Sequence, residues 1–173
     1  MTIDHPDIEY ERLVGDNDLS DAHEVRRRVF VDEQGIVTAE EDRDGLDLEA
    51  EHYVGYDGDN PVVVARVRCP KPGIAKIERV ATLDSHRSRG IGGELTERII
   101  DDLRRDGVSL ATLNAQREAE GFYLLHGFTT VSEPFEEAGV PHVRMERQIG
   151  MTRRLDLENT GSSGASGIAG TFI

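Results

Sequence analysis

The sequence predicts an α/β fold, in which a mixed and mostly antiparallel sheet carries helices on both faces. Three apolar runs, at 52–56, 62–68 and 74–83, are separated by short turn sequences, which is typical of consecutive antiparallel strands. A helical pattern at 91–103 then leads into another apolar run at 110–115. Because a helix that connects two strands favours their parallel pairing, we expect one parallel pair within the same sheet.

The N-terminal segment supplies the first strand and the first helix. Residues 8–14 alternate weakly between apolar and polar side chains and are expected to form a strand. A helix is expected from a cap at Asp18 or Ser20 to about Val29, since apolar side chains gather near one of its faces. The three arginines at 26–28 are interpreted as its solvated end, where the helix dipole favours positive charge.

The connections between these elements are predicted as loops and turns. Residues 37–51 are acidic and irregular, so we interpret them as a mobile loop. Residues 57–60 and 70–73 are expected to form turns because of their Asp, Pro and Gly residues. The helix at 91–103 has apolar residues at every fourth position, and Gly107 is expected to end it.

The C-terminal third is expected to complete the sheet. A short helix is predicted over 118–126, and residues 128–131 and 143–149 are predicted as a final strand pair around a long acidic turn. Residues 1–150 are therefore expected to form a single domain. Residues 151–173 are rich in Gly and Ser and of low complexity, and we interpret them as a flexible tail.

The composition limits the function. The chain of 173 residues carries a formal net charge of −14, and so acidic a surface repels nucleic acid. No apolar run approaches the ~20 residues that cross a bilayer, the N-terminus does not resemble a signal peptide, and Cys69 is the only cysteine, so we expect a cytoplasmic protein without membrane association. The six histidines and the single cysteine are not spaced as metal ligands, so no metal is expected.

The excess of Asp and Glu has two interpretations. With only two lysines, Lys71 and Lys76, the composition is typical of proteins from salt-accumulating organisms. An acidic mesophilic protein is the alternative. The first interpretation predicts that molar KCl stabilises the fold by screening self-repulsion.

The most informative segment is Arg87-Ser88-Arg89-Gly90-Ile91-Gly92, which joins the predicted strand at 74–83 to the predicted helix at 91–103. Backbone N–H groups in the first turn of a helix are unpaired, and glycines let a ligand approach them closely. The loop therefore suits a phosphate or pyrophosphate. It has neither the lysine of a Walker loop nor the third glycine of a dinucleotide fingerprint.

The loop instead resembles the R-x-x-G-x-G pyrophosphate motif of the GCN5-related N-acetyltransferases, the GNAT superfamily. A helical segment with Tyr123, followed by Gly and Phe at 127–128, resembles a second recurrent motif of that superfamily. Residues 29–34 and 135–145 are similar to its bacterial ElaA-type branch. The resemblance covers roughly residues 8–149.

The resemblance implies the GNAT acyl-CoA N-acyltransferase fold, in which two parallel strands splay apart. It implies an enzyme that transfers the acetyl group of acetyl-CoA to a primary amine, of a small molecule or a protein, by direct attack in a ternary complex. A non-catalytic acyl-CoA-binding or sensing module is the alternative, and formation of a homodimer is left open. The residues that the resemblance implies in cofactor binding are Val80, Ala81, Thr82, Arg87, Ser88, Arg89, Gly90, Ile91, Gly92, Gly93 and Gln116.

Two residues are expected to carry the chemistry. Tyr123 matches the family tyrosine that protonates the departing thiolate, and a tyrosine of the hydrophobic core is the alternative. Glu78 is expected to share a strand face with Val80 and Thr82, and partial burial is expected to raise its pKa into the range of a general base. The alternative for Glu78 is an ion pair with an arginine such as Arg66.

Other side chains are expected on the acceptor side. Glu33 and His142 are alternative bases or substrate-binding residues; the alternative for His142 is a structural role. Glu136 and Glu137, together with Glu33, would give an acidic mouth that suits a cationic amine. Surface solvation is the preferred interpretation of clustered carboxylates in so acidic a chain.

Overall fold

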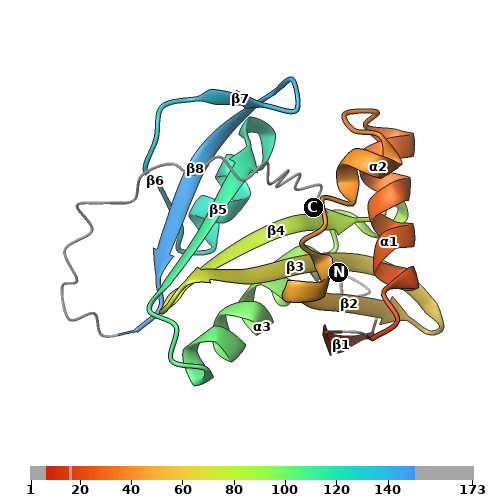
Figure 1. Cartoon of the computed structure of the whole chain (residues 1–173), viewed down its shortest axis with the longest axis horizontal. Coiled ribbons are helices and arrows are strands. Elements are labelled where there is room, and N and C mark those ends of the chain that lie inside the picture. Colours follow the sequence, from red (N-terminus) through yellow and green to blue (C-terminus); the bar gives the residue numbers. More distant parts are fainter. Residues whose placement is uncertain (1–6, 16, 151–173) are drawn as a thin grey trace, which may run out of the picture.

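An eight-stranded mixed sheet forms the centre of the molecule (Figure 1). The computed structural model describes residues 7–15 and 17–150, so the predicted tail at 151–173 lies outside the described residues. The strands lie in the order β1-β2-β3-β4-β5-β8-β6, and β7 pairs with β8. The strands are β1 (Ile8–Val14), β2 (Glu51–Asp57), β3 (Asn60–Lys71), β4 (Ile74–Thr82), β5 (Leu110–Gln116), β6 (Thr129–Thr130), β7 (Phe135–Glu137) and β8 (Val140–Gln148). The helices are α1 (Ser20–Arg26), η1 (Arg27–Glu33), α2 (Ala39–Asp42), η2 (Asp47–Glu49), η3 (Asp84–His86), α3 (Ile91–Arg105), η4 (Arg117–Ala119) and α4 (Glu120–Leu125).

One parallel pair interrupts an otherwise antiparallel sheet. Strands β2, β3 and β4 are antiparallel neighbours, and β4 and β5 are parallel, so both predictions are confirmed. The parallel ladder is short: Ile74 lies opposite Leu110, and Lys76 opposite Thr112 ends it. Beyond these residues the two strands diverge, which gives the sheet the V shape seen in Figure 1.

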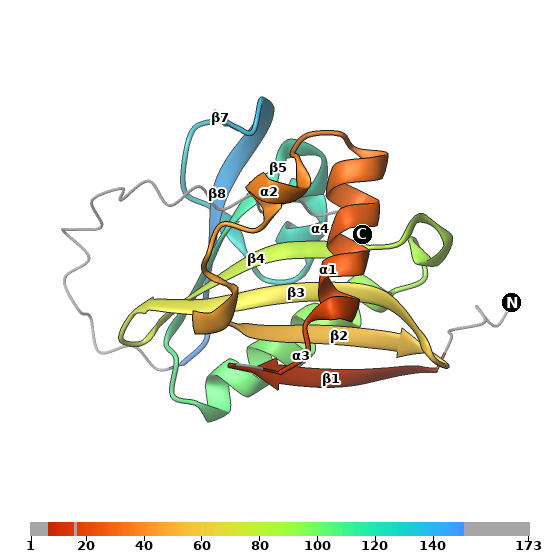
Figure 2. The ribbon, with the colours of Figure 1, turned by 45° about the vertical axis from the view of Figure 1, so that its right-hand side comes forward.

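Helices cover both faces of β2, β3 and β4, with α1 in front of these strands and α3 behind them in Figure 2. From α1 and η1, Val25, Val29 and Phe30 are fully buried. From α3, the spacing of Leu95 and Ile99 places both in the core. Among the described residues, no helix is long and apolar enough to span a membrane.

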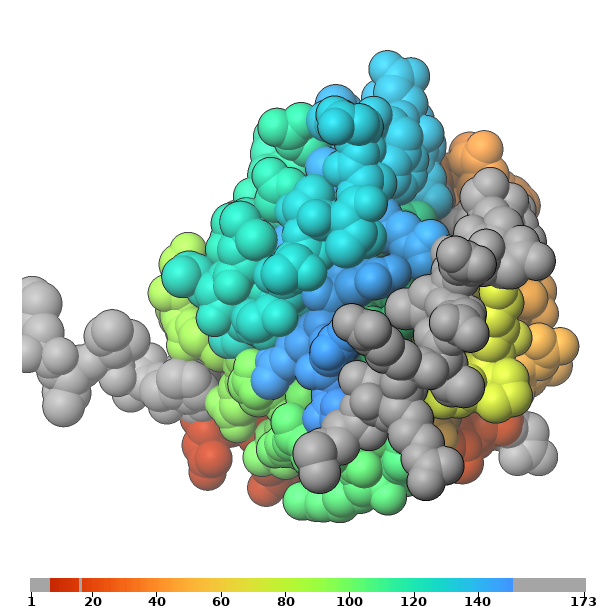
Figure 3. Space-filling model, turned by 90° about the vertical axis from the view of Figure 1, so that its left-hand side faces the viewer, coloured from red at the N-terminus to blue at the C-terminus, as the bar shows by residue number. Residues whose placement is uncertain are grey.

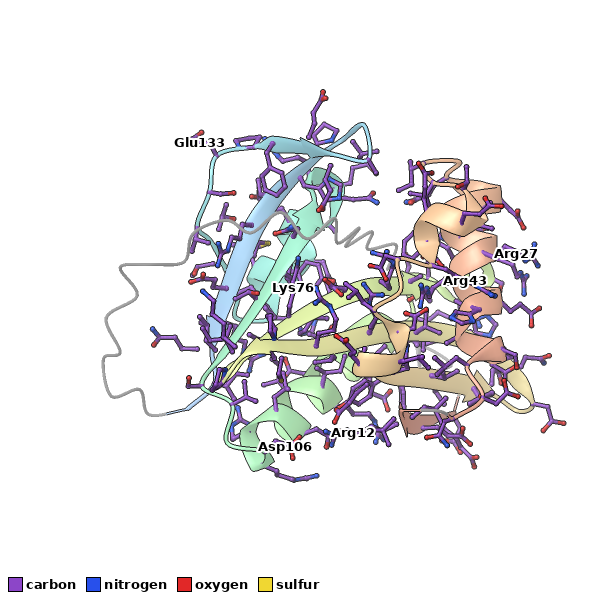
Figure 4. All side chains as sticks on the ribbon, in the orientation of Figure 1. Arg12, Arg27, Arg43, Lys76, Asp106 and Glu133 are labelled. Carbon is purple, nitrogen blue, oxygen red and sulfur yellow. The ribbon has the colours of Figure 1, made fainter. Side chains whose placement is uncertain are left out.

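Polar contacts fix α3 against the edge of the sheet. The Tyr53 hydroxyl donates to Asp102 over 2.9 Å, and Arg12 pairs with Asp106 over 2.7 Å. Figure 4 shows Arg12 and Asp106 side by side at the end of α3. The C-terminal end of α3 is thereby tied to β1 and β2, while its N-terminal end lies near the end of β4.

The C-terminal strands extend the β5 arm of the V. As predicted, the strand after 127 pairs with the last strand, with Thr129 opposite Glu146. Strand β7 was not predicted; it is three residues long and turns into β8 through Ala138 and Gly139, which both have positive φ. Figure 3 shows the segment from α4 to β7 (cyan) lying against β8 (blue) at this end of the molecule.

The interpretation of residues 37–51 as a mobile loop is wrong. The segment contains α2, whose start is closed by a capping box between Thr38 and Glu41, and then η2. Asp42 is buried at the end of α2. Arg26 is also 1% exposed, so the helix end at 26–28 is not simply solvated. Buried opposite charges hold this acidic segment against the sheet.

Candidate active site

A gap opens between β4 and β5 where the parallel ladder stops. Beyond Lys76 and Thr112, no backbone pairing joins the facing edges of residues 77–82 and 113–116. Figure 4 shows Lys76 at the point where the two strands separate. Unpaired N–H and C=O groups along a strand edge are ready to bond an extended ligand.

A helix start lies at the end of this gap. After β4 the chain passes through η3 into the loop, where Ser88 and Gly90 have φ of 60° and 79°. Gly90 occupies the N-cap position of α3, and no side chain caps the helix. The amides of the first turn, at 91–93, therefore remain for an anion, which the dipole of a 15-residue helix favours.

The first turn of α3 also packs closely against α4. A Cβ atom built on Gly93 would lie 2.9 Å from the ring of His126. The His126 ring contacts Phe122 with their centroids 4.5 Å apart and their planes tilted by 44°. The absence of a side chain at Gly93 thus brings α4, which carries Tyr123, beside the predicted anion site.

The two arginines of the loop differ. Arg89 is exposed. Arg87 donates to both carboxylate oxygens of Glu33, over 2.5 and 2.6 Å, and its Nε donates to the Thr82 carbonyl over 3.0 Å. Arg87 therefore ties the end of η1 and the end of β4 to the loop. The carboxylate of Glu33 is thus bound to Arg87, and its role as a base or acceptor residue stays a prediction.

Tyr123 is 1% exposed and lies on α4. Its ring contacts Phe122 and Phe128 edge to face, with centroids 5.0 and 5.5 Å apart. These contacts hold the ring rigidly, which suits either a core tyrosine or a positioned acid. The catalytic role of Tyr123 stays a prediction.

Glu78 has none of the expected properties of a general base. Its carboxylate is fully buried and accepts hydrogen bonds from Arg66 over 2.9 Å and from Arg68 over 2.9 and 2.7 Å, and Lys76 lies 3.4 Å away. Burial by itself would raise the pKa of Glu78, but the bonds and charges of these cations outweigh it and hold the pKa at about 2. The expected raised pKa is therefore wrong, and the alternative ion pair with Arg66 is present.

The expectation that Glu78 shares a strand face with Val80 and Thr82 is also wrong, because a bulge interrupts β4. The register between β3 and β4 shifts by one residue between the pairs Val64–Ala81 and Arg66–Glu78, and Arg79 has a φ of 54°. Val64 and Arg66 share one face of β3, so Glu78 shares its face with Ala81 instead of Val80 and Thr82. Thr82 then lies on the α3 face.

Thr82 leaves an unsatisfied polar atom near the loop. Thr82 is 1% exposed, and no group in the described part of the chain forms a hydrogen bond with its Oγ1. A buried hydroxyl without a partner is unusual in a native protein. A polar ligand in the gap would satisfy it, which fits the predicted cofactor stretch at Val80, Ala81 and Thr82.

A buried ion network, which sequence reasoning missed, lies on the α1 face of the same strands. Aspartates of the segment 37–51 pair with arginines of α1, β3 and β4 at distances of 2.8 to 3.3 Å. Burial alone would raise the pKa of Asp44, but hydrogen bonds from Arg66 and the Leu46 amide, with the charges of Arg66 and Arg79, hold it at about 2. The network fixes α2 and η2 beside the gap. Its members are Arg26, Asp42, Asp44, Asp47, Arg66 and Arg79.

The end of β5 and the hairpin of β7 and β8 form the other wall. Gln116 is buried, and its amide and that of Gln34 lie 3.4 Å apart. His142 lies opposite Gln116 in the register and is fully buried; its Nδ1 lies 2.7 Å from the carbonyl of Val140. Glu137 is only partly exposed, so the interpretation of this carboxylate as a solvated surface group is wrong.

A second hollow of the surface lies apart from the gap between β4 and β5. It has a volume of about 710 Å³, lies between α1, η1 and α2 and is open to solvent. Arg27, which lines it, lies on the far side of α1 from Lys76 in Figure 4. This hollow has neither the helix start nor the strand edges described above, so the gap between β4 and β5 remains the candidate site.

Comparison with known proteins identifies relatives of this arrangement. Residues 18–149 match a family described as an acetyltransferase (GNAT) domain. The chain is similar to the uncharacterized N-acetyltransferase YjcF of Bacillus subtilis (strain 168), with 45% identity over 128 residues, which are 73% of this chain and 90% of that protein.

Solved structures agree with that match. The structure of Escherichia coli ElaA resembles this one with a TM-score of 0.72 and 29% identity, covering 81% of this chain and 99% of the other. A GNAT family acetyltransferase from Elizabethkingia anophelis with acetyl-CoA bound has a TM-score of 0.62 over 82% of this chain and 97% of the other. Its identity is 13%, so this likeness concerns the fold alone. The predicted fold and the resemblance to the ElaA-type branch are confirmed.

Proposed function

Since the chain belongs to the GNAT acetyltransferase family, we propose that it transfers the acetyl group of acetyl-CoA to a primary amine by direct attack in a ternary complex. The uncapped start of α3, at the end of two splayed strands, is the observation that carries this proposal. The proposed setting is the cytoplasm. The acceptor is an amine of a small molecule or of a protein.

The residues around the gap fit the cofactor. In the proposal, the amides from Ser88 to Gly93 bind the pyrophosphate, with Arg89 adding positive charge and Arg87 holding the loop in place. The free edge of Val80–Thr82 binds the pantetheine arm, and Gln116 lines the opposite wall. The unsatisfied Oγ1 of Thr82 is a further group available to it. When bound, acetyl-CoA supplies the activated acetyl thioester.

Tyr123 has the role of the acid in this proposal. As the amine nitrogen bonds the acetyl carbon and the carbon–sulfur bond breaks, the phenol gives its proton to the departing sulfur. A phenol, with an ordinary pKa near 10, is a suitable partner for this step. The aromatic contacts with Phe122 and Phe128 keep the ring in one orientation.

The replacement Tyr123→Phe tests this role. It keeps the ring and its packing, so we expect the acetyl-CoA dissociation constant from calorimetry to change by less than about 3-fold. Turnover should fall by about 100-fold or more, the usual contribution of a positioned acid. Tyr56→Phe is the matched control, because the Tyr56 hydroxyl bonds Asp21 away from the gap. An unchanged rate in Tyr123→Phe would remove the assigned role.

The acceptor is to be found with a panel of polyamines, amino sugars and lysine peptides. Acetyl transfer to any of them supports the proposed function. Binding of acetyl-CoA without turnover across the panel would favour the alternative, an acyl-CoA sensor. No binding of coenzyme A would contradict both.

A further inference from the structure

We propose that Glu137, backed by His142, accepts the proton that the acceptor amine must lose before it attacks. This inference rests on the proposed function, and it assigns to the β7–β8 hairpin the task that the sequence assigned to Glu78. The carboxylate of Glu78 is occupied by Arg66, Arg68 and Lys76, so its lone pairs are already used.

Glu137 and His142 face each other, and each has one unsatisfied polar atom. Oε2 of Glu137 lies 3.8 Å from Nε2 of His142, which is too long for a direct hydrogen bond. Both atoms are buried and lack a hydrogen-bond partner within residues 7–15 and 17–150. The His142 side chain is 0% exposed and that of Glu137 14%, so Glu137 is the member of the pair that solvent or a ligand reaches.

The fold places this pair on the wall of the gap. His142 lies opposite Phe135 in the register of the hairpin and opposite Gln116 at the end of β5. The His142 ring stacks on the Phe135 ring with their centroids 6.1 Å apart, so Phe135 packs against one face of the imidazole. The charged side chains of Lys76, Glu78 and Arg79 interact electrostatically with Glu137. These three residues lie on β4, the opposite wall of the gap.

The protonation states suit a proton acceptor. Burial raises the pKa of Glu137, although Lys76, Asn114 and Arg79 oppose the shift. Burial lowers the pKa of His142, so its imidazole is neutral at neutral pH, and a proton on Nδ1 donates to the carbonyl of Val140. Nε2 then carries a free lone pair directed to the carboxyl group.

The proton balance is simple. An ammonium group of the acceptor gives one proton to the carboxylate of Glu137 and becomes a neutral amine. The resulting carboxyl O–H donates a hydrogen bond to Nε2 of His142, after the two atoms close from 3.8 Å to bonding distance. His142 is thus a positioning residue, which stabilises the protonated form of Glu137.

Kinetics on variants test the assignment. We expect Glu137→Gln to lower kcat/KM for the amine by about 100-fold or more at pH 7, with an unchanged acetyl-CoA dissociation constant. The loss should shrink about 10-fold for each pH unit above 7, because more of the acceptor is then already neutral. Glu133→Gln, at an exposed position just before β7, is the control and should retain the rate. A full rate in Glu137→Gln, or a loss that is the same at pH 7 and pH 9.5, would overturn the proposal.

His142→Asn tests the positioning role. Removing the acceptor of the carboxyl proton lowers the pKa of Glu137, so the acidic limb of the kcat/KM profile should move to lower pH. A purely structural role would lower activity without moving the limb. Thermal unfolding of each variant verifies that it is folded.

A measurement without substrate separates this proposal from the proposed function. In the nitrogen NMR spectrum of the imidazole, we expect a neutral His142 with its proton on Nδ1 and a shift of Nε2 as Glu137 titrates. Glu137→Gln should abolish that shift. An Nε2 signal that ignores Glu137 overturns the pair even if the enzyme acetylates amines, and a coupled pair in a protein without turnover contradicts only the acetyl transfer.

Discussion

Replacing Glu78 with glutamine removes a negative charge from a fully buried position while keeping the size of the side chain. The carboxylate holds Arg66, Arg68 and Lys76 together on one face of β3 and β4. Glutamine still offers an oxygen, but its amide nitrogen must face cations that no longer have their counter-charge. Breaking a buried ion pair from one side is strongly destabilising for this reason.

The magnitude follows from the pKa of Glu78. It falls from an ordinary 4.5 to about 2 in the fold, and each pKa unit corresponds to ~1.4 kcal/mol, so the ionised group contributes about 3 kcal/mol. We therefore expect Glu78→Gln to lower the free energy of unfolding by about 3 kcal/mol at pH 7. For a domain of this size, that is a fall in Tm of about 6–12 °C.

The pH dependence gives the sharper test. Because the folded pKa of Glu78 is depressed, its stabilisation is complete above pH 4.5 and is lost as the pH falls toward about 2. The free energies of unfolding of the two proteins, measured in urea at pH 7, 5, 4 and 3, should converge at the acidic end. Glu118→Gln, at an exposed position, is the control and should stay within about 0.5 kcal/mol of the parent. A difference below about 1 kcal/mol at pH 7, or one that grows in acid, would refute the reasoning.

Two further predictions concern the loop and the net charge. In Gly90→Val a β-branched side chain meets a φ of 79°, so the loop should rearrange and acetyl-CoA affinity, measured by calorimetry, should fall at least about 10-fold. Gly58→Val, at a φ of 60° in the turn before β3, is the matched control for strain and should bind normally. Raising KCl to about 1 M should raise the Tm by screening the repulsion of a chain with net charge −14. A Tm that stays constant or falls would count against a high-salt origin.

The sequence reveals the parts of this site that are local. The loop at 87–92 could be predicted because a glycine pattern at a helix start has a direct meaning for backbone geometry. The parallel pairing of β4 and β5 could be predicted because a strand, a helix and a second strand follow each other in the chain. Both depend on neighbours in sequence, and both are present in the structure.

The failures concern contacts between distant residues. Glu78 was placed on the wrong face because nothing in the sequence marks the bulge at Arg79. The segment 37–51 resembles a solvated loop because its partners, Arg66 among them, belong to later strands. Glu137 resembles one more surface carboxylate until the hairpin brings it to His142. The one sequence signal for these contacts was the presence of arginines within apolar strand runs. A buried arginine needs a buried counter-charge, so such arginines indicate that carboxylates lie near them.

The bulge at Arg79 shifts the phase of β4 by one residue. After the bulge, each side chain lies on the sheet face opposite to the one it would have in a regular strand. The faces of the residues after the bulge therefore depend on the number of residues in β4, and not only on which residues they are. Deleting a single residue near Arg79 would restore a regular strand and exchange the orientations of Ala81 and Thr82. During divergence, this stretch should therefore tolerate substitutions far better than insertions or deletions.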